Sequence, residues 1–209
     1  MRVKVCGITQ EEQLLQLPGA GVSFAGFIFY PKSPRYVLRH MTTNQIKKEN
    51  TINKVGVFVN ASVDEVLQMV DECRLHMVQL HGDETPKYCE KIADYISVVK
   101  AFRFSETDNI GYRIQEYMSY CDMFMFDTEG VGYGGTGKKF NLEKLHGVTV
   151  GKPYFLSGMI EPGDAAALNE FAQRPEAKAL FAVDISTKFE LMPGIKDMNL
   201  VKKFTEQLK

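Results

Sequence analysis

The chain has 209 residues, of which 44% are hydrophobic and 24% charged, and its net charge is -1. This composition is typical of a folded globular protein and argues against intrinsic disorder. The absence of a basic surplus argues against nucleic acid or an anionic membrane as the partner. The length predicts a single domain, residues 1–209, and the lack of a long apolar run or an apolar signal core predicts a cytoplasmic protein.

Eight short apolar runs recur along the chain and predict eight strands. Most are rich in Val, Ile and Phe and alternate little between polar and apolar residues, which indicates strands buried on both faces of a parallel sheet. The runs are Val3–Cys6, Phe24–Tyr30, Lys54–Val59, Met77–Leu80, Ile96–Phe102, Asp122–Asp127, Tyr154–Leu156 and Phe181–Ile185.

Segments of helical periodicity separate these runs. A helix is expected after the capping residue Ser62, and another after Asp83–Pro86. Pro162–Asp164 introduces a helix over 165–172, and the apolar spacing of 199–208 predicts a final helix. The helices after the first, second and sixth runs are more weakly indicated.

The alternation of about eight strands with about eight helices predicts βαβ units with right-handed crossovers. Eight such units favour an α/β fold of the (β/α)8 TIM-barrel class, for which about 200 residues suffice. An open, doubly wound parallel sheet is the alternative architecture.

In a barrel the active site forms at the carboxyl ends of the strands. Cys6 ends the first predicted strand and Asp127 ends the sixth. A thiol at such a position becomes a base only if the site favours its thiolate, and otherwise is an inert buried side chain. A carboxyl group beside apolar residues can act as a general acid, although it can equally cap the following turn.

Gly132–Lys138 has the form GxxxxGK, which resembles most of a phosphate-binding P-loop. Lys139 stands where that motif needs a Ser or Thr hydroxyl, so the segment is interpreted mainly as a glycine-rich active-site loop. The remaining cysteines, Cys73, Cys89 and Cys121, are interpreted as free packing residues. No cluster of His and Cys with ligand spacing is evident, so no metal is expected.

The last two predicted strands end in Ser157-Gly158 and in Ser186-Thr187. Barrels often bind phosphate at this position through backbone N–H groups. Arg35, in a proline-containing loop, is a candidate for binding a substrate carboxylate with two hydrogen bonds.

These segments together resemble the phosphoribosylanthranilate isomerase family of tryptophan biosynthesis, and the resemblance spans nearly the whole chain in order. The matching segments are Lys4–Thr9, Gly26–Tyr36, Val55–Asn60, Val78–Gly82, Gly134–Lys138, Leu156–Gly158, Val183–Asp184 and Pro193–Asp197.

The resemblance implies an Amadori rearrangement of N-(5-phosphoribosyl)anthranilate to 1-(2-carboxyphenylamino)-1-deoxyribulose 5-phosphate. It implies that Asp127 is the general acid and Cys6 the general base. It further implies that Arg35 binds the anthranilate carboxylate, with Gln79 and His81 on the same side. The phosphate residues that it implies are Ser157, Gly158, Asp184, Ser186 and Thr187.

The chain departs from the family pattern at Met159, where a second glycine is usual, and near Lys188, where a small residue is usual. Lys188 is a candidate phosphate ligand. No cofactor is implied, and the expected partner is the phosphorylated sugar-amine substrate, bound by a monomer or a homodimer. The alternatives are a P-loop nucleotide-binding protein centred on Gly132–Lys138 and a barrel that binds a phosphorylated ligand without catalysis.

Overall fold

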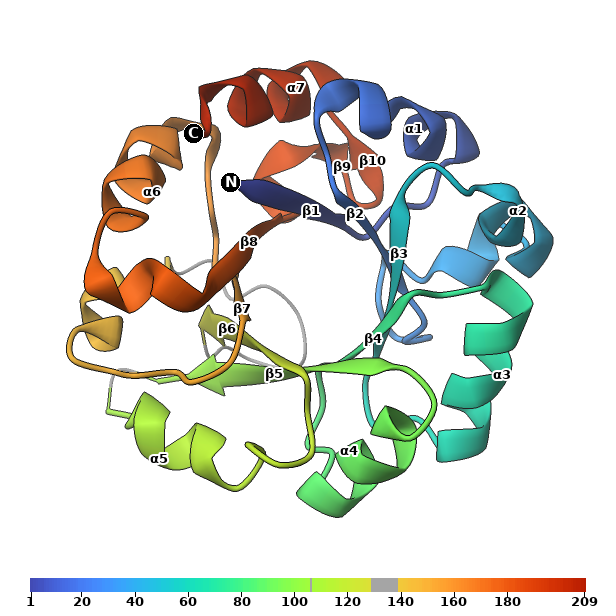
Figure 1. The fold of residues 1–209 in the computed structure, drawn as a ribbon. Coiled ribbons are helices and arrows are strands. Elements are labelled where there is room, and N and C mark those ends of the chain that lie inside the picture. Colours follow the sequence, from blue (N-terminus) through green and yellow to red (C-terminus); the bar gives the residue numbers. More distant parts are fainter. Residues whose placement is uncertain (106, 129–138) are drawn as a thin grey trace.

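Eight parallel strands form a closed barrel in the computed structural model, which describes residues 1–105, 107–128 and 139–209 (Figure 1). The barrel closes because β1 pairs with β8, with Arg2 opposite Ala182 and Lys4 opposite Asp184. The predicted (β/α)8 barrel is therefore confirmed and the open sheet is wrong. The strands are β1 (Arg2–Cys6), β2 (Phe24–Ile28), β3 (Asn53–Phe58), β4 (Met77–Leu80), β5 (Ser97–Phe104), β6 (Met123–Thr128), β7 (Tyr154–Leu156) and β8 (Leu180–Ile185).

Helices surround the barrel, as Figure 1 shows. They are α1 (Glu11–Gln16), α2 (Thr43–Lys48), α3 (Val63–Cys73), α4 (Pro86–Ala93), α5 (Ile110–Gln115), α6 (Ala165–Phe171) and α7 (Met198–Gln207). The expected helix after β6 is wrong for the described residues: 139–153 contain only the 3-10 turn Leu142–Leu145, which Asn141 caps. Gly147 and Gly151 follow with φ of +72° each, a left-handed conformation that interrupts a helix.

Local hydrogen bonds explain where two of the predicted helices begin. The Ser62 hydroxyl accepts a hydrogen bond from the Glu65 N–H, and the Glu65 carboxylate accepts one from the Ser62 N–H, which is a complete capping box for α3. The Thr85 hydroxyl accepts from the Tyr88 N–H, and Pro86 occupies the first turn of α4, where its missing N–H costs nothing.

The barrel interior contains a small core of its own, separate from the large core between strands and helices. The rings of Phe24, Phe155 and Phe181 contact one another with centroids 5.4–5.6 Å apart, and they fill the barrel below the carboxyl ends of the strands. Because side chains alternate along a strand, the residue two positions beyond an inward core residue also points inward. This rule carries the inward face from Met125 to Asp127 and from Ala182 to Asp184.

A hairpin that the sequence analysis did not predict lies between β8 and α7. It consists of β9 (Glu190–Met192) and β10 (Ile195–Lys196), joined through Pro193 and Gly194. The Thr9 hydroxyl, in the loop after β1, donates to the Gly194 carbonyl at 2.6 Å. This contact attaches the hairpin, and with it Glu190, to the carboxyl end of β1.

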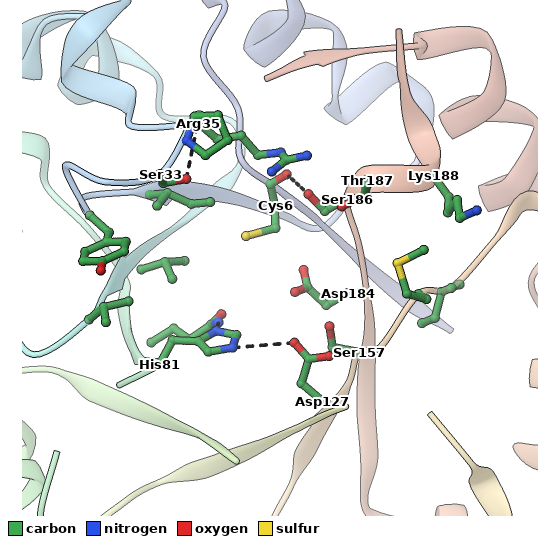
Figure 2. A pocket seen from close by; sticks show the side chains of 18 of the residues that line it. Cys6, Ser33, Arg35, His81, Asp127, Ser157, Asp184, Ser186, Thr187 and Lys188 are labelled. Carbon is green, nitrogen blue, oxygen red and sulfur yellow. Dashed lines mark hydrogen bonds and ion pairs between the residues drawn. The ribbon is translucent and has the colours of Figure 1, made fainter. Parts of the chain in front are cut away.

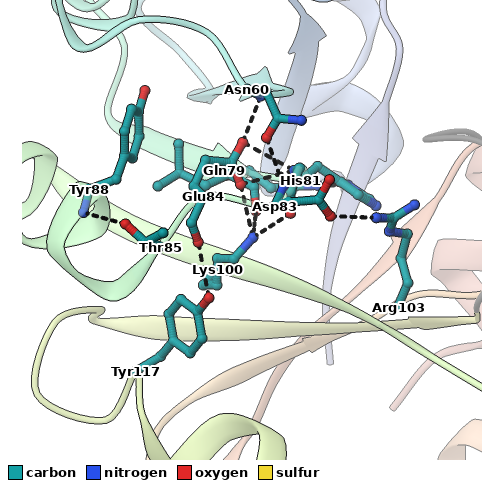
Figure 3. Close-up of polar contacts among 12 residues, drawn as sticks. Asn60, Gln79, His81, Asp83, Glu84, Thr85, Tyr88, Lys100, Arg103 and Tyr117 are labelled. Carbon is teal, nitrogen blue, oxygen red and sulfur yellow. Dashed lines mark hydrogen bonds and ion pairs between the residues drawn. The ribbon is translucent and has the colours of Figure 1, made fainter.

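A buried ion pair orders the loop between β4 and α4 (Figure 3). Lys100 Nζ lies 2.9 Å from the Glu84 carboxylate, which also accepts hydrogen bonds from the backbone N–H groups of Asn60 and Gly82. A buried carboxylate must be paired and hydrogen-bonded in this way to remain charged. The loop that follows His81 is therefore held from two neighbouring strands.

The described residues contain no helix long and apolar enough to cross a membrane. All four cysteines are free thiols and all are buried.

Candidate active site

A cavity of about 260 Å³ opens at the carboxyl ends of the strands (Figure 2). It collects side chains from most strands and from the loops after β2, β7 and β8. All of the predicted site residues line it except Gly158; they are Cys6, Arg35, Gln79, His81, Asp127, Ser157, Asp184, Ser186 and Thr187. Residues far apart in the sequence are thus brought to one site.

Cys6 ends β1 with its side chain directed into the cavity and only 7% of the residue exposed. Gly26, its partner on β2, makes room for it: a Cβ atom at Gly26 would lie 3.1 Å from Cys6 Sγ and 3.1 Å from Lys4 Cε. Burial raises the pKa of the Cys6 thiol above its ordinary value, although Lys4 and Lys196 act in the opposite direction. The thiolate is therefore costly to form in this site.

Two buried lysines, each paired with a carboxylate, lie beside Cys6. Lys4 Nζ is 2.9 Å from Asp184 Oδ1, and both side chains are almost completely buried. Lys196 Nζ is 2.6 Å from Glu190 Oε1 and donates to the Ser186 hydroxyl at 3.3 Å. Pairing is what makes buried ammonium groups tolerable in a barrel interior.

Asp127 ends the inward face of β6 and points into the same cavity (Figure 2). Its Oδ2 lies 3.6 Å from His81 Nε2, and its Oδ1 accepts a 2.7 Å hydrogen bond from the Thr128 N–H. Gln79 Nε2 is 2.7 Å from His81 Nδ1, so the imidazole is held from its other side. Asp127 therefore has a fixed orientation with one oxygen on the His81 side of the cavity.

Arg35 lies in the loop after β2, over Gly7, whose φ of +78° and missing Cβ allow the close approach. Glu190 accepts from Arg35 Nε at 2.8 Å and from Nη2 at 2.6 Å. Nη1 has no partner among the described residues. The guanidinium thus lines the cavity in an orientation fixed by the β9–β10 hairpin, with one edge left to donate.

The residues after β7 and β8 form a separate part of the cavity, here called the phosphate corner: Ser157, Met159, Ser186, Thr187 and Lys188. Gly158 and Met159 adopt successive left-handed conformations, with φ of +97° and +51°. A left-handed Met is strained relative to Gly, so the chain keeps the turn that a second glycine would favour and places the Met159 side chain on the cavity. A Cβ at Gly158 would lie 2.8 Å from Phe140 Cβ and from Thr128 Oγ1, so that position faces away from the cavity, toward Phe140 and Thr128.

Lys188 reaches the cavity from the loop after β8 and is paired with Glu161 at 3.0 Å. Glu161 also binds Lys139 at 3.2 Å, and the hydrogen bonds from Lys188 and Lys139 lower the pKa of its carboxyl group. One carboxylate therefore holds two lysines at the rim beside the phosphate corner.

Sequence reasoning missed Lys4, Glu190 and Lys196. The position of Lys4, two residues before Cys6, was a usable signal because both side chains then share one face of β1. Glu190 and Lys196 reach the site only through the unpredicted hairpin. The apolar wall of the cavity was also missed; it comprises Ile28, Val57, Val59 and Ile160.

Gly132–Lys138, with its resemblance to a P-loop, lies outside the described residues. In the part of the chain that the structure describes, no group of three or more His, Cys, Asp or Glu side chains is placed to hold a metal ion.

Comparison with known proteins identifies the family. The family model of N-(5'-phosphoribosyl)anthranilate (PRA) isomerase matches residues 3–207. The chain belongs to the PRA isomerase family. It is 34% identical over its full length to N-(5'-phosphoribosyl)anthranilate isomerase of Parabacteroides distasonis, covering 93% of that protein. The chain therefore has PRA isomerase activity in tryptophan biosynthesis.

Solved structures of PRA isomerases share the fold. The phosphoribosyl anthranilate isomerase of Thermotoga maritima superposes with a TM-score of 0.85 at 32% identity, over 99% of this chain and 98% of that one. Another, with a TM-score of 0.81 at 30% identity over 99% and 97%, is a complex with reduced 1-(o-carboxyphenylamino)-1-deoxyribulose 5-phosphate. Dimeric members exist, because the Thermotoga maritima enzyme is named as a dimer in a study of its monomeric forms.

Gly26→Ala tests the packing around Cys6 in this PRA isomerase. The added methyl group would lie 3.0 Å from Cys6 Cα and 3.1 Å from Sγ, so either the thiol or Lys4 must move. We expect a several-fold lower kcat and a loss of about 1–3 kcal/mol in the free energy of unfolding. Steady-state kinetics and urea denaturation measure both effects.

Gly19→Ala is the matched control, because its added methyl group meets no described atom within 4 Å. Unchanged kcat in Gly26→Ala would show that the thiol does not need this space.

Proposed function

We propose that the chain catalyses an Amadori rearrangement of N-(5'-phosphoribosyl)anthranilate in which Asp127 is the general acid and Cys6 the general base. The observation that carries the proposal is that a thiol from β1 and a carboxyl group from β6 point into one cavity (Figure 2). An acid and a base on different sides of one sugar can act in succession without the bound substrate having to reorient in the cavity. The unit that acts is the single 209-residue domain, as a monomer or in a homodimer.

The reaction begins at the ring oxygen of the ribose. Asp127 gives its proton to this oxygen, the bond from the oxygen to C1 breaks, and the anthranilate nitrogen forms a Schiff base with C1. The Cys6 thiolate then removes the proton from C2, and the electron pair released forms the C1–C2 double bond of an enolamine. The enolamine tautomerises to the ketone of 1-(2-carboxyphenylamino)-1-deoxyribulose 5-phosphate. Each proton transfer contributes roughly 10²–10⁴-fold to the rate.

The two ends of the substrate suit the two parts of the cavity. The apolar wall, with Val57 and Val59, accommodates an aromatic ring. The carboxylate on that ring accepts from Arg35, while Gln79 and His81 line the same side. Since Glu190 already occupies two guanidinium nitrogens, the carboxylate is expected on Nη1.

The phosphate is assigned to the phosphate corner, where Ser157, Ser186 and Thr187 offer hydroxyl and backbone groups. Gly158 does not line the cavity, so its proposed contribution is limited to its backbone N–H. We propose for Asp184 a different role from the one that the family resemblance implies. A carboxylate repels phosphate, and Asp184 is paired with Lys4 deep in the barrel. Its remaining oxygen is suited to accept a hydrogen bond from a ribose hydroxyl.

Substitution of the acid and the base tests the mechanism. We expect Cys6→Ser and Asp127→Asn each to lower kcat by at least about 10²-fold, because each removes one proton-transfer group. The measurement follows the loss of substrate fluorescence under steady-state conditions. Near-normal turnover by Asp127→Asn would refute the mechanism, and inactivity of the unmodified protein would favour a barrel that binds its ligand without catalysis.

Lys188→Ala tests the phosphate corner. Lys188 can exchange Glu161 for the substrate phosphate at little cost, because the Lys188–Glu161 pair is largely exposed. We expect the KM to rise several-fold with little change in kcat, since the phosphate does not react. Lys202→Ala, an exposed lysine on α7, is the control, and an unchanged KM in Lys188→Ala would exclude the phosphate role.

A further inference from the structure

Lys4 is a fully buried lysine that the mechanism above does not use. It lies two residues before Cys6 on β1, so both side chains point into the barrel. None of its surface is exposed, and its ammonium group lies 2.9 Å from Asp184 Oδ1. A buried ammonium group is expensive to desolvate, and an apolar side chain could fill the same space more cheaply. Its position beside the reactive thiol suggests a functional reason for retaining it.

The geometry brings the Lys4 side chain to the thiol. Lys4 Cε and Cys6 Sγ both lie 3.1 Å from the point that a Cβ atom at Gly26 would occupy. The ammonium group donates a 2.9 Å hydrogen bond to Asp184 Oδ1, and the charges of Asp184 and of the nearby Cys6 sulfur raise the pKa of Lys4, although burial lowers it. Lys4 therefore stays protonated and within reach of the sulfur.

Other charged groups also act on Cys6. Lys196 from β10 and Arg35 from the loop after β2 are positive, and both are neutralised in part by Glu190. Asp184 from β8 is negative and disfavours the thiolate. Asp127 and His81 lie across the cavity and act electrostatically on Asp184. Among these groups, Lys4 favours the thiolate most strongly.

We propose that the Lys4 ammonium group is the counter-ion of the Cys6 thiolate. Asp184 limits this stabilisation, because it holds the ammonium group in place while its own negative charge opposes that of the sulfur. Lys4 is thus a positioning residue that acts through Cys6. The inference rests on the proposed role of Cys6 as the base, but it concerns the free enzyme and can be tested without substrate.

The two members of the ion pair are predicted to have opposite effects on the thiol. Lys4→Met removes the positive charge, so the pKa of the Cys6 thiol rises. Asp184→Asn removes the negative charge, and the Lys4 ammonium group then has the Cys6 sulfur as its negative partner. The pKa of the thiol therefore falls. A purely structural role for the pair would not give opposite signs, because both variants break the same contact.

The test is the rate of alkylation of the free protein by iodoacetamide as a function of pH. Only the thiolate reacts, so the midpoint of the profile is the pKa of the thiol. Removing a charged group that lies this close to a thiol in a buried site changes the pKa of the thiol by about 1 or more. We therefore expect alkylation on the acidic limb of the profile to slow by about tenfold or more in Lys4→Met and to accelerate in Asp184→Asn. The reaction of the Cys6→Ser protein is subtracted as the background from the other thiols.

Lys54→Met is the matched control. Lys54 is equally buried, but its ammonium group donates to the carbonyl groups of Ile46 and Lys47 at the end of α2, away from Cys6. We expect a loss of stability without a shift in the alkylation profile. If Lys4→Met fails to fold, the midpoint of the Asp184→Asn profile still tests the proposal, because greater access to the thiol would speed alkylation at every pH without moving the midpoint to lower pH.

The outcomes separate the two proposals. Unchanged profiles, or shifts of the same sign in Lys4→Met and Asp184→Asn, would overturn the counter-ion role even if Cys6→Ser is inactive. Opposite shifts would support it even if Cys6→Ser retains turnover, in which case the proposed base would be wrong instead.

Discussion

The pairing of β1 with β8 is the contact on which the site depends. It closes the barrel and sets Lys4 opposite Asp184, so that a buried ion pair forms directly beneath Cys6. Without closure these side chains would lie on the two edges of an open sheet, and the ammonium group would have no carboxylate to compensate for its burial. The contact that closes the barrel therefore also places the charged groups beside the Cys6 thiol.

The phenylalanine core inside the barrel determines how deep the cavity reaches. Phe24, Phe155 and Phe181 fill the barrel below the site, so among the described residues they close the cavity on the side opposite the carboxyl ends of the strands. Reactive groups occur one inward position beyond this core, where the alternation of side chains along a strand directs them into the cavity. The fold thereby supplies rigid walls, and the loops supply Arg35, Met159 and Lys188.

The sequence predicted the strands well because each is a short apolar run between turn-forming residues. It also predicted the cavity residues at strand ends, since parallel strands all end at one rim of a barrel. It did not predict the β9–β10 hairpin, whose strands are too short to give a periodic pattern, and for that reason it missed Glu190 and Lys196. The family resemblance implied a phosphate role for Asp184, and no pattern in the sequence indicates that Lys4 pairs with this carboxylate at 2.9 Å. The helix expected after β6 failed where Gly147 and Gly151 interrupt the segment.

A structure of this protein with reduced 1-(o-carboxyphenylamino)-1-deoxyribulose 5-phosphate bound would test the central claim most directly. The account predicts Cys6 Sγ in contact with C2 of the sugar and a carboxylate oxygen of Asp127 within hydrogen-bond distance of the C4 oxygen, which is the ring oxygen of the substrate. The sulfur and the carboxylate would then approach the sugar from different sides. A sugar bound out of contact with either group, or with both groups on the same side, would contradict the account.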